Sequence, residues 1–259
     1  MPKQSINLIY CRESKGQGNF GDELSKFIAE KLIDNDKYIL HFNKTNIDKN
    51  LICIGSYIHQ AKNNCYIFGS GVRTANNIEN GHKYSNLNVC AVRGPLTKKF
   101  LDERGIVTPN IFGDPALLLP NFYLPKIVID LKDKIGVLPH KSNYKNYKDK
   151  IDASKFFLIN PLDKWENVIN YICSCKSIIS SSLHGLICSD AYNIPNLWID
   201  EFKLKEGDFK FRDYFLSQNR DYKKINNLSN YSDDKLYTKG NILDLDKLEK
   251  AFPFNSCLQ

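Results

Sequence analysis

The stretch SIISSSLHGLICSDAYNIPNLWID, residues 177–200, decides the fold. Two short apolar runs enclose an amphipathic run that has the spacing of a helix. Residues 177–181 therefore predict a buried strand, residues near 184–193 a helix, and residues 196–200 a second strand. A strand, a helix and a strand of these lengths predict a βαβ unit, whose two strands lie parallel in one sheet.

The same alternation of apolar runs and helical patterns covers most of the chain. Further strand-like runs are SINLIYC (5–11), LICIGS (51–56), CYIFGSG (65–71), NVCAVRG (88–94), KIGVLPH (134–140) and KFFLIN (155–160). Helical patterns follow the first run, recur at 95–105 between Pro95 and Gly105, and occur near 162–174. Strands that alternate with helices of this length predict an α/β fold with parallel sheets.

The Pro-containing segment 120–126 separates two series of strands. We therefore expect two α/β domains, an N-terminal one over residues 1–125 and a C-terminal one over residues 126–259. The polar stretch 217–240 is rich in Asn, Ser and Asp and is expected to be loop. The run ILDLDKLEKAF is expected to form a last helix that packs back on the body.

Composition limits the class of protein. With 42% hydrophobic residues in 259, the chain can bury sizeable cores without disulfides or metals. The eight cysteines lie in apolar segments, and the N-terminus lacks the pattern of a signal peptide, so we expect reduced thiols in a cytoplasmic protein without a metal site. No apolar run is long enough to span a membrane. The net charge of +7 is spread along the chain, which argues against a nucleic-acid binder and agrees with small anionic substrates or an anionic membrane face.

Polar clusters occur where predicted strands end, the place at which open parallel sheets bind ligands. The turn GQGNFGD (16–22) leads into a helix, whose first N–H groups can receive an anion, or it is a flexible turn in which Asp22 caps the helix. In RGPLT (93–97), Arg93 offers a fork of donors for carboxylate or phosphate, or it forms a surface salt bridge.

Two further clusters carry an acid and an imidazole. Asp114 lies between Gly113 and Pro115, either as part of a turn or as an acid whose position the chain fixes on both sides. In the first stretch, the strand ends in serines and His184 opens the next helix. Hydroxyl and N–H groups at a helix N-terminus favour an anion, and a histidine there can bind it or transfer a proton. A Ser-His hydrolase is disfavoured because no G-x-S-x-G motif is present.

Together these clusters resemble the polysaccharide pyruvyl transferase family, over residues 6 to about 216. The motifs that carry the resemblance are GNFGDELSKFIAEKL (18–32), AVRGPLTKKFLDERGI (91–106), FGDPALLLP (112–120), GVLPHKSNY (136–144), SSSLHGLICSDAYNIPNLWI (180–199) and FKFRDYF (209–215). The last of these resembles the branch of the family found in bacterial exopolysaccharide and capsule biosynthesis.

The resemblance implies two Rossmann-like domains that face a central cleft, as in type B glycosyltransferases. It implies transfer of the pyruvyl group of phosphoenolpyruvate to two hydroxyls of a sugar, with formation of a ketal and release of phosphate. No cofactor is implied. The partners would be phosphoenolpyruvate and a sugar or lipid-linked oligosaccharide, with no nucleic acid, and the enzyme would be cytoplasmic or peripheral at the inner membrane face.

The resemblance also assigns residues to the site. His184 would be the acid or the phosphate contact, and Asp114 and Asp22 would be bases toward the acceptor. Further donor or acceptor contacts would come from Arg93, Ser181, Ser182, Leu183, Gly185, Asn19, His140, Lys141, Lys210 and Arg212. Some relatives have an arginine at the position of Ser182, so we expect Lys141, Lys210 or Arg212 to supply that charge.

Two other functions fit the same sequence features. One is a glycosyltransferase that uses a nucleotide-sugar donor on the same architecture, since a fold does not fix a reaction. The other is a glycan-binding or polyanion-binding protein without catalysis, which would use the positive net charge.

Overall fold

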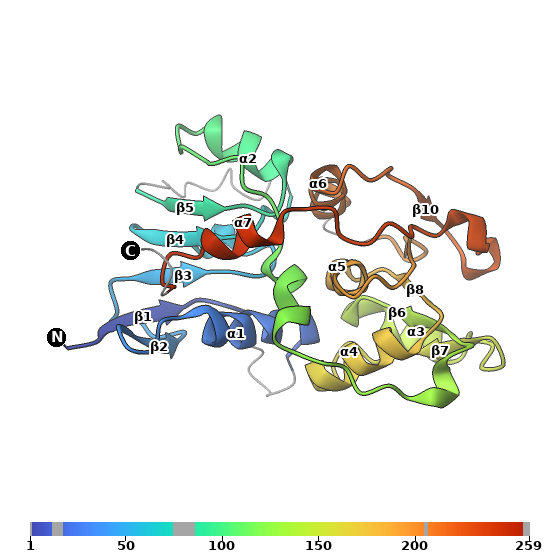
Figure 1. Ribbon diagram of the computed structural model, residues 1–259. Coiled ribbons are helices and arrows are strands. Elements are labelled where there is room, and N and C mark those ends of the chain that lie inside the picture. Colours follow the sequence, from blue (N-terminus) through green and yellow to red (C-terminus); the bar gives the residue numbers. More distant parts are fainter. Residues whose placement is uncertain (1, 12–17, 75–85, 205–206, 256–259) are drawn as a thin grey trace.

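The computed structural model describes residues 2–11, 18–74, 86–204 and 207–255, and these form two parallel five-stranded sheets with helices around them (Figure 1). The α/β class predicted from the sequence is confirmed. Gly16 and Gln17 of the predicted anion-binding turn lie outside the described residues.

The first sheet has the strand order β2-β1-β3-β4-β5. Its strands are β1 (Gln4–Leu8), β2 (Tyr38–Phe42), β3 (Asn50–Ile52), β4 (Cys65–Phe68) and β5 (Asn88–Ala91). Its two helices are α1 (Phe20–Leu32), which follows β1, and α2 (Pro95–Asp102), which follows β5. The arrows of this sheet point toward the second sheet, so the carboxyl ends of its strands lie near the middle of the molecule (Figure 1).

The second sheet has the order β10-β9-β8-β6-β7. Its strands are β6 (Ile135–Leu138), β7 (Phe156–Leu158), β8 (Ser177–Ser180), β9 (Asn196–Ile199) and β10 (Lys224–Ile225). Its helices are α3 (Tyr144–Lys148), α4 (Trp165–Ser174), α5 (Leu183–Ala191) and α6 (Phe209–Ser217). The predicted parallel unit is present as β8-α5-β9. The expectation of loop throughout 217–240 is wrong at β10, which pairs with β9.

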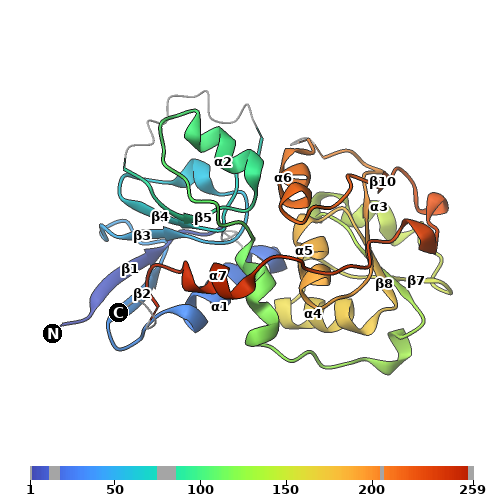
Figure 2. The same cartoon turned by 45° about the horizontal axis from the view of Figure 1, so that its top comes forward.

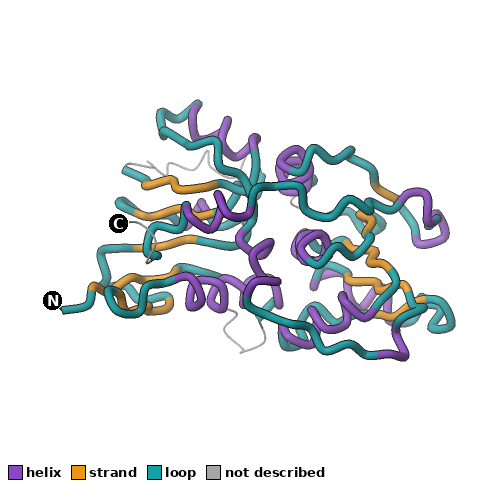
Figure 3. Tube along the Cα trace, viewed as in Figure 1, coloured by secondary structure: helices purple, strands orange, loops and turns teal. Residues whose placement is uncertain are grey.

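Helical segments lie between the two sets of strands (Figure 3). The 3₁₀ helix η2 (Pro115–Asn121) contacts both α1 and α5. Helices α1 and α4 meet through the rings of Phe27 and Trp165, whose centroids are 4.5 Å apart, and α2 contacts α6. Shorter 3₁₀ turns are η1 (Ile58–Gln60), η3 (Ile129–Leu131), η4 (Lys141–Asn143), η5 (Leu228–Asn230) and η6 (Asp233–Lys235).

The C-terminal segment leaves the second sheet and reaches the first (Figure 2). Its helix α7 (Leu245–Lys250) contacts η2, and the ring of Phe252 packs on Phe68 of β4 with centroids 5.2 Å apart. Both ends of the chain therefore contribute to the part of the molecule that contains the first sheet. None of the helices in the described ranges has the length and apolar character needed to cross a bilayer.

Candidate active site

A cavity of about 260 Å³ lies where loops from both sheets meet. In each sheet the first strand in the chain pairs with the second on one side and the third on the other, so the order reverses between the first and third strands. Ligands of open parallel sheets bind outside the carboxyl ends of strands at such a switch point. The lining residues are Cys11, Asn19, Asp22, Gly55, Ser56, Tyr57, Arg73, His140, Lys141, Ser182, Leu183, His184 and Lys210.

Most of this lining comes from the two switch points. Cys11 follows β1 and Gly55 follows β3 in the first sheet, and His140 follows β6 and Ser182 follows β8 in the second. The cavity is therefore the place at which the two switch points face each other. This position is typical of an active site in α/β proteins.

The serines at the end of β8 hold the neighbouring loops in place. The hydroxyl of Ser180 donates to the backbone oxygen of Leu138 at 2.7 Å and accepts from the backbone N–H of Ser182 at 3.0 Å. The hydroxyl of Ser181 accepts from the backbone N–H of His140 at 2.9 Å. A Cβ on Gly185 would lie 2.3 Å from the Ser180 hydroxyl, so glycine is required there. Ser180, Ser181 and Gly185 thus shape the wall, and Ser182 begins α5 at the cavity.

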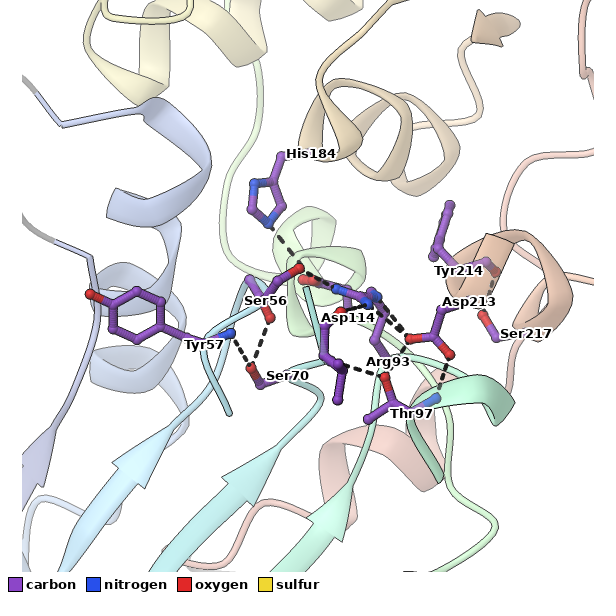
Figure 4. A network of polar contacts seen from close by, with 12 residues as sticks. Ser56, Tyr57, Ser70, Arg93, Thr97, Asp114, His184, Asp213, Tyr214 and Ser217 are labelled. Atoms are coloured by element: carbon purple, nitrogen blue, oxygen red, sulfur yellow. Dashed lines mark hydrogen bonds and ion pairs between the residues drawn. The ribbon is translucent and has the colours of Figure 1, made fainter. Parts of the chain in front are cut away.

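His184 reaches the cavity because Gly21 leaves room for its ring. A Cβ on Gly21 would lie 2.0 Å from Nδ1 of His184, closer than any real contact. The residue is only 7% exposed, yet its side chain lines the cavity. Its Nε2 lies 3.8 Å from Oδ2 of Asp114, and neither atom has a hydrogen-bond partner among the described residues (Figure 4). A small movement would join them, as is common for catalytic pairs without substrate.

Asp114 is held beneath the imidazole and does not line the cavity. Its backbone conformation is extended, its Oδ1 accepts from the N–H of Ala116 at 3.0 Å, and it is fully buried. It therefore caps η2 and presents its other oxygen to His184. This geometry differs from the predicted direct contact with an acceptor hydroxyl, because the ring of His184 lies between.

Asp22 lies in the first turn of α1 and lines the cavity directly. Burial raises the pKa of its carboxyl, while the nearby charges of His184 and Lys141, a hydrogen bond with Cys11 and the charge of Arg73 act in the opposite direction. Of the two predicted bases, Asp22 is the one that a ligand in the cavity can touch.

Cationic groups dominate the cavity. Among the described residues, Arg73, Lys141 and Lys210 line it, against the single carboxylate of Asp22. The N-terminal turn of α5, which begins after Ser182, faces the same space. The first N–H groups of a helix lack partners within the helix and favour an anion. The cavity therefore suits a small ligand with more than one negative group.

Arg93 lies behind the cavity wall and is completely buried (Figure 4). Its Nε donates to Oδ2 of Asp213 at 3.0 Å, its Nη1 to the hydroxyl of Ser56 at 2.7 Å, and its Nη2 to the backbone oxygen of Val72 at 2.7 Å. Asp213 also accepts from the N–H and the hydroxyl of Thr97, at 2.9 and 2.6 Å. This arrangement differs from the expected direct contact with substrate, because a carboxylate of the protein itself already neutralises the guanidinium.

The predicted residues thus fall into three groups. Those that line the cavity are His184, Asp22, Asn19, His140, Lys141, Ser182, Leu183 and Lys210. Those packed beneath its wall are Asp114, Ser181, Gly185 and Arg93. Arg212 lines a different hollow, on the other side of α6. Of the three residues expected to replace the missing arginine charge, Lys141 and Lys210 line the cavity and Arg212 does not.

Five lining residues were not predicted: Cys11, Gly55, Ser56, Tyr57 and Arg73. The sequence indicates three of them, Gly55, Ser56 and Tyr57, because the run LICIGS ends at Ser56 and contains the third strand of its sheet. The switch-point rule would have selected the turn after it. Arg73 follows β4, and nothing in its local sequence distinguishes it.

The described residues do not form a cluster that could hold a metal ion. Over residues 2–11, 18–74, 86–204 and 207–255, no three His, Cys, Asp or Glu side chains come close enough to bind one ion. The seven cysteines in these ranges are free thiols.

Comparison with known proteins matches most of the chain to one family model. The family model described as polysaccharide pyruvyl transferase matches residues 10–201, which include every described lining residue except Lys210. The chain belongs to the polysaccharide pyruvyl transferase family. A relative within reach of sequence comparison is an uncharacterized protein of Acanthamoeba polyphaga mimivirus, 29% identical over 239 residues, which cover 85% of this chain and 81% of that protein. In this member of the polysaccharide pyruvyl transferase family, Lys210 lines the cavity although it lies beyond the matched region.

Proposed function

We propose that the chain transfers the pyruvyl group of phosphoenolpyruvate onto two hydroxyls of a sugar in a cell-surface polysaccharide precursor. The supporting observation is the set of charged groups at the facing switch points: three cations, an imidazole backed by a carboxylate, and a second carboxylate, around about 260 Å³. Phosphoenolpyruvate carries a phosphate and a carboxylate on the same carbon, so its site needs several cationic or N–H donors. The proposal joins this set to the membership of the family.

Each charged end of the donor has a matching group in the proposal. Lys141 follows β6 and Lys210 lies in the first turn of α6, so they approach the cavity from the second sheet. Arg73 follows β4 and approaches from the first sheet. A ligand with two anionic ends is thus bound between cations from both sheets, with the N-terminus of α5 as a further contact.

The reaction needs one proton donated and two removed. Protonation of the methylene carbon makes the central carbon electrophilic, and a sugar hydroxyl adds to it and loses its proton. The bond from this carbon to the phosphate oxygen then breaks, a second hydroxyl adds and loses its proton, and the ring of the ketal closes. Phosphate leaves with the remaining proton. Each transfer requires a positioned acid or base.

His184 and Asp22 are the groups placed to move these protons. Oδ2 of Asp114 lies 3.8 Å from Nε2 of His184 and has no hydrogen-bond partner among the described residues, so His184 is the proposed acid toward the donor. The raised pKa of Asp22 lets its carboxyl exchange a proton closer to neutrality than an ordinary aspartate. Asp22 is the proposed base toward the acceptor.

The test is to incubate the purified protein with phosphoenolpyruvate and a panel of β-galactosides and related glycans, and to follow phosphate release. His184→Ala and Asp22→Asn should each lower the rate by about 10²-fold to 10⁴-fold, the usual contribution of a positioned acid or base. His41→Ala is the matched control, because His41 lies on β2 with its ring 3.2 Å from the Ser5 hydroxyl, away from the cavity.

Binding is measured in parallel by calorimetry with phosphoenolpyruvate alone. If the protein does not bind phosphoenolpyruvate and releases no phosphate with any acceptor, the proposal is contradicted. A rise in melting temperature with nucleotide-sugars and none with phosphoenolpyruvate would instead favour a glycosyltransferase, through the linkage between ligand binding and stability. Full activity in both His184→Ala and Asp22→Asn would be compatible with the proposed reaction but would show that these two residues do not catalyse it.

A further inference from the structure

A second hollow lies on the opposite side of α6 from the cavity. It has a volume of about 580 Å³ and is lined by Asp208, Arg212, Phe215 and Leu216 of α6 and its cap and by the turn 219–222; we call it the α6 hollow. Arg212, Phe215 and Leu216 lie four, seven and eight positions after Asp208, so these residues share one face of the helix. Lys210 and Arg212 are two positions apart and therefore point to opposite faces. The same helix therefore contributes Lys210 to the cavity and Arg212 to the α6 hollow.

A buried arginine forms the floor of the α6 hollow. Arg220 is 8% exposed, and its guanidinium lies between the rings of Phe215 and Tyr237, at 4.4 and 4.1 Å from their centroids. Its Nη1 donates to Asp190 at 3.3 Å and its Nη2 to the backbone oxygen of Asn196 at 3.5 Å. A guanidinium has five N–H donors, so within the described residues these two bonds leave donors for a ligand.

The rim of the α6 hollow combines polar groups with two apolar surfaces. Tyr222 is 39% exposed and Leu216 is 53% exposed. Tyr222 is held in place by contacts with Trp198, at 4.9 Å between centroids, and with Phe215, and its hydroxyl donates to Asp208. A fixed ring beside an exposed aliphatic side chain is a preorganised surface for a ligand with an apolar face.

The charges of the α6 hollow balance. Arg212 and Arg220 are matched by Asp208 and Asp221, and Asn219 adds an amide. A polyanion binds where positive charge accumulates, so this lining does not favour one. Equal numbers of positive and negative side chains beside apolar surfaces fit a neutral ligand with many hydroxyls.

The α6 hollow also continues beyond one ligand unit. An adjoining hollow of about 170 Å³ shares Asn219, Arg220 and Asp221 with it. Arg220 therefore borders both spaces from below. The adjoining hollow has a positive excess, with Lys223, Lys235 and Lys239 beside Arg220 against Asp221 and Asp234, so the balanced lining that suits a neutral sugar is that of the α6 hollow.

We propose that the α6 hollow binds neutral sugar residues of a polysaccharide chain, at a distance from the sugar that reacts. The inference rests on the proposed function, since it makes these residues part of the acceptor. The chain would be held on the outer face of α6 while its reacting end occupies the cavity on the inner face.

The probes are neutral mono- and trisaccharides of glucose, galactose and mannose at millimolar concentration, observed by saturation-transfer NMR. We expect at least one trisaccharide to bind the wild type more tightly than its monosaccharide does. Tyr222→Ser and Asn219→Ala should weaken it at least fivefold, because they remove the ring surface and the shared amide. Leu216→Asp provides a third test at an exposed position, and Lys132→Ala, on the exposed turn after η3, is the control.

Absence of binding by every sugar, or binding that all three variants leave unchanged, overturns the inference. Binding of dextran sulfate in place of neutral sugars overturns it as well, because it indicates a polyanion site. Sugar binding should persist in His184→Ala and without phosphoenolpyruvate. The measurement therefore separates failure of this inference from failure of the proposed reaction.

Discussion

At the scale of the residue, the imidazole of His184 depends on the absence of a side chain at Gly21. The ring occupies the space that a Cβ would fill, with Nδ1 only 2.0 Å from its ideal position. The φ angle of Gly21 lies outside the left-handed region. An alanine at this position would therefore clash with the ring of His184 but would add no backbone strain. The glycine of the NFGDE motif is thus explained by a contact with a residue 163 positions later in the chain.

Gly21→Ala should therefore displace the ring and lower phosphate release by about 10²-fold, the lower limit for loss of a positioned acid. Gly18→Ala is the matched control in the same turn, because its Cβ meets only the far end of the flexible Glu23 side chain. Both rates are measured with phosphoenolpyruvate and the best acceptor, and folding is checked by circular dichroism. Equal rates in the two variants would show that the position of the ring is not decisive.

Asp22 gives a prediction about pH. Burial raises the pKa of its carboxyl in the folded protein, so the native state holds this proton more tightly than the unfolded chain. The resulting stability is present below the ordinary pKa of an aspartate and is lost as the pH rises through the raised value. Asn does not titrate, so the free energy of unfolding of Asp22→Asn should increase relative to wild type between pH 3.5 and pH 7.

The measurement is urea denaturation of both proteins at the two pH values. Asp34→Asn serves as the opposite case, since despite burial the hydrogen bonds from Asp36 and Lys37 lower the pKa of that carboxyl. Its free energy of unfolding should decrease relative to wild type over the same interval. A relative loss of stability in Asp22→Asn at pH 7 would contradict the stated cause.

At the scale of the element, one ion pair fixes α6 against the first sheet. Arg93 follows β5 and Asp213 lies on α6, and both are fully buried. Buried pairs contribute little net stability, but breaking one leaves an uncompensated charge. Gly71 and Gly94 make room for the pair, because a Cβ on Gly71 would lie 2.2 Å from Cζ of Arg93 and one on Gly94 would lie 2.0 Å from the backbone oxygen of Asp213.

The consequence for the cavity can be measured with two matched variants. Asp213→Asn and Asp190→Asn each break a buried Asp–Arg pair, so each should lose about 3–5 kcal/mol of stability. Only Asp213 is paired with the arginine that holds Ser56, and it is three residues from Lys210, so only its replacement should disturb the cavity. We expect the Kd of phosphoenolpyruvate to rise at least tenfold in Asp213→Asn and less than twofold in Asp190→Asn.

Calorimetry at a temperature where both variants remain folded gives these constants. If both Kd values change equally, the ion pair of Arg93 contributes only to stability. If neither changes, Lys210 is held in place by other contacts of α6.

At the scale of the whole molecule, the sequence predicts most strands because buried parallel strands leave continuous apolar runs. It misses β2 and β10, which lie at the ends of their sheets; β2 is only partly buried, and β10 has two residues. It misses α6 as a helix because Lys210 and Asp213 interrupt the apolar face for the cavity and the ion pair. Functional residues break the pattern by which a helix is recognised.

The sequence likewise predicted part of the candidate site and missed the rest. Residues beside strand ends were found, since the carboxyl ends of parallel strands are the expected place for ligands. The turn after β3, with Gly55, Ser56 and Tyr57, was missed although the switch-point rule selects it, whereas nothing in the sequence around Arg73 indicates its approach to the cavity, which depends on how separate strands pack together. The burial of Arg93 was missed for a related reason, since its partner lies 120 positions away.

The facing sheets lead to a last prediction, about ligand binding by both at once. Arg73 comes from the first sheet and Lys141 from the second, so a dianionic ligand between them should require both. Phosphoenolpyruvate at 100 times its Kd should stabilise the wild type by about 2.7 kcal/mol through linkage, measured as a rise in melting temperature. Arg73→Gln and Lys141→Gln should each remove most of this rise at the same ligand concentration, whereas Lys132→Gln on the exposed turn after η3 should retain it. If one of the two cavity variants keeps the full rise, the donor binds to a single sheet, and the facing switch points do not form a shared donor site.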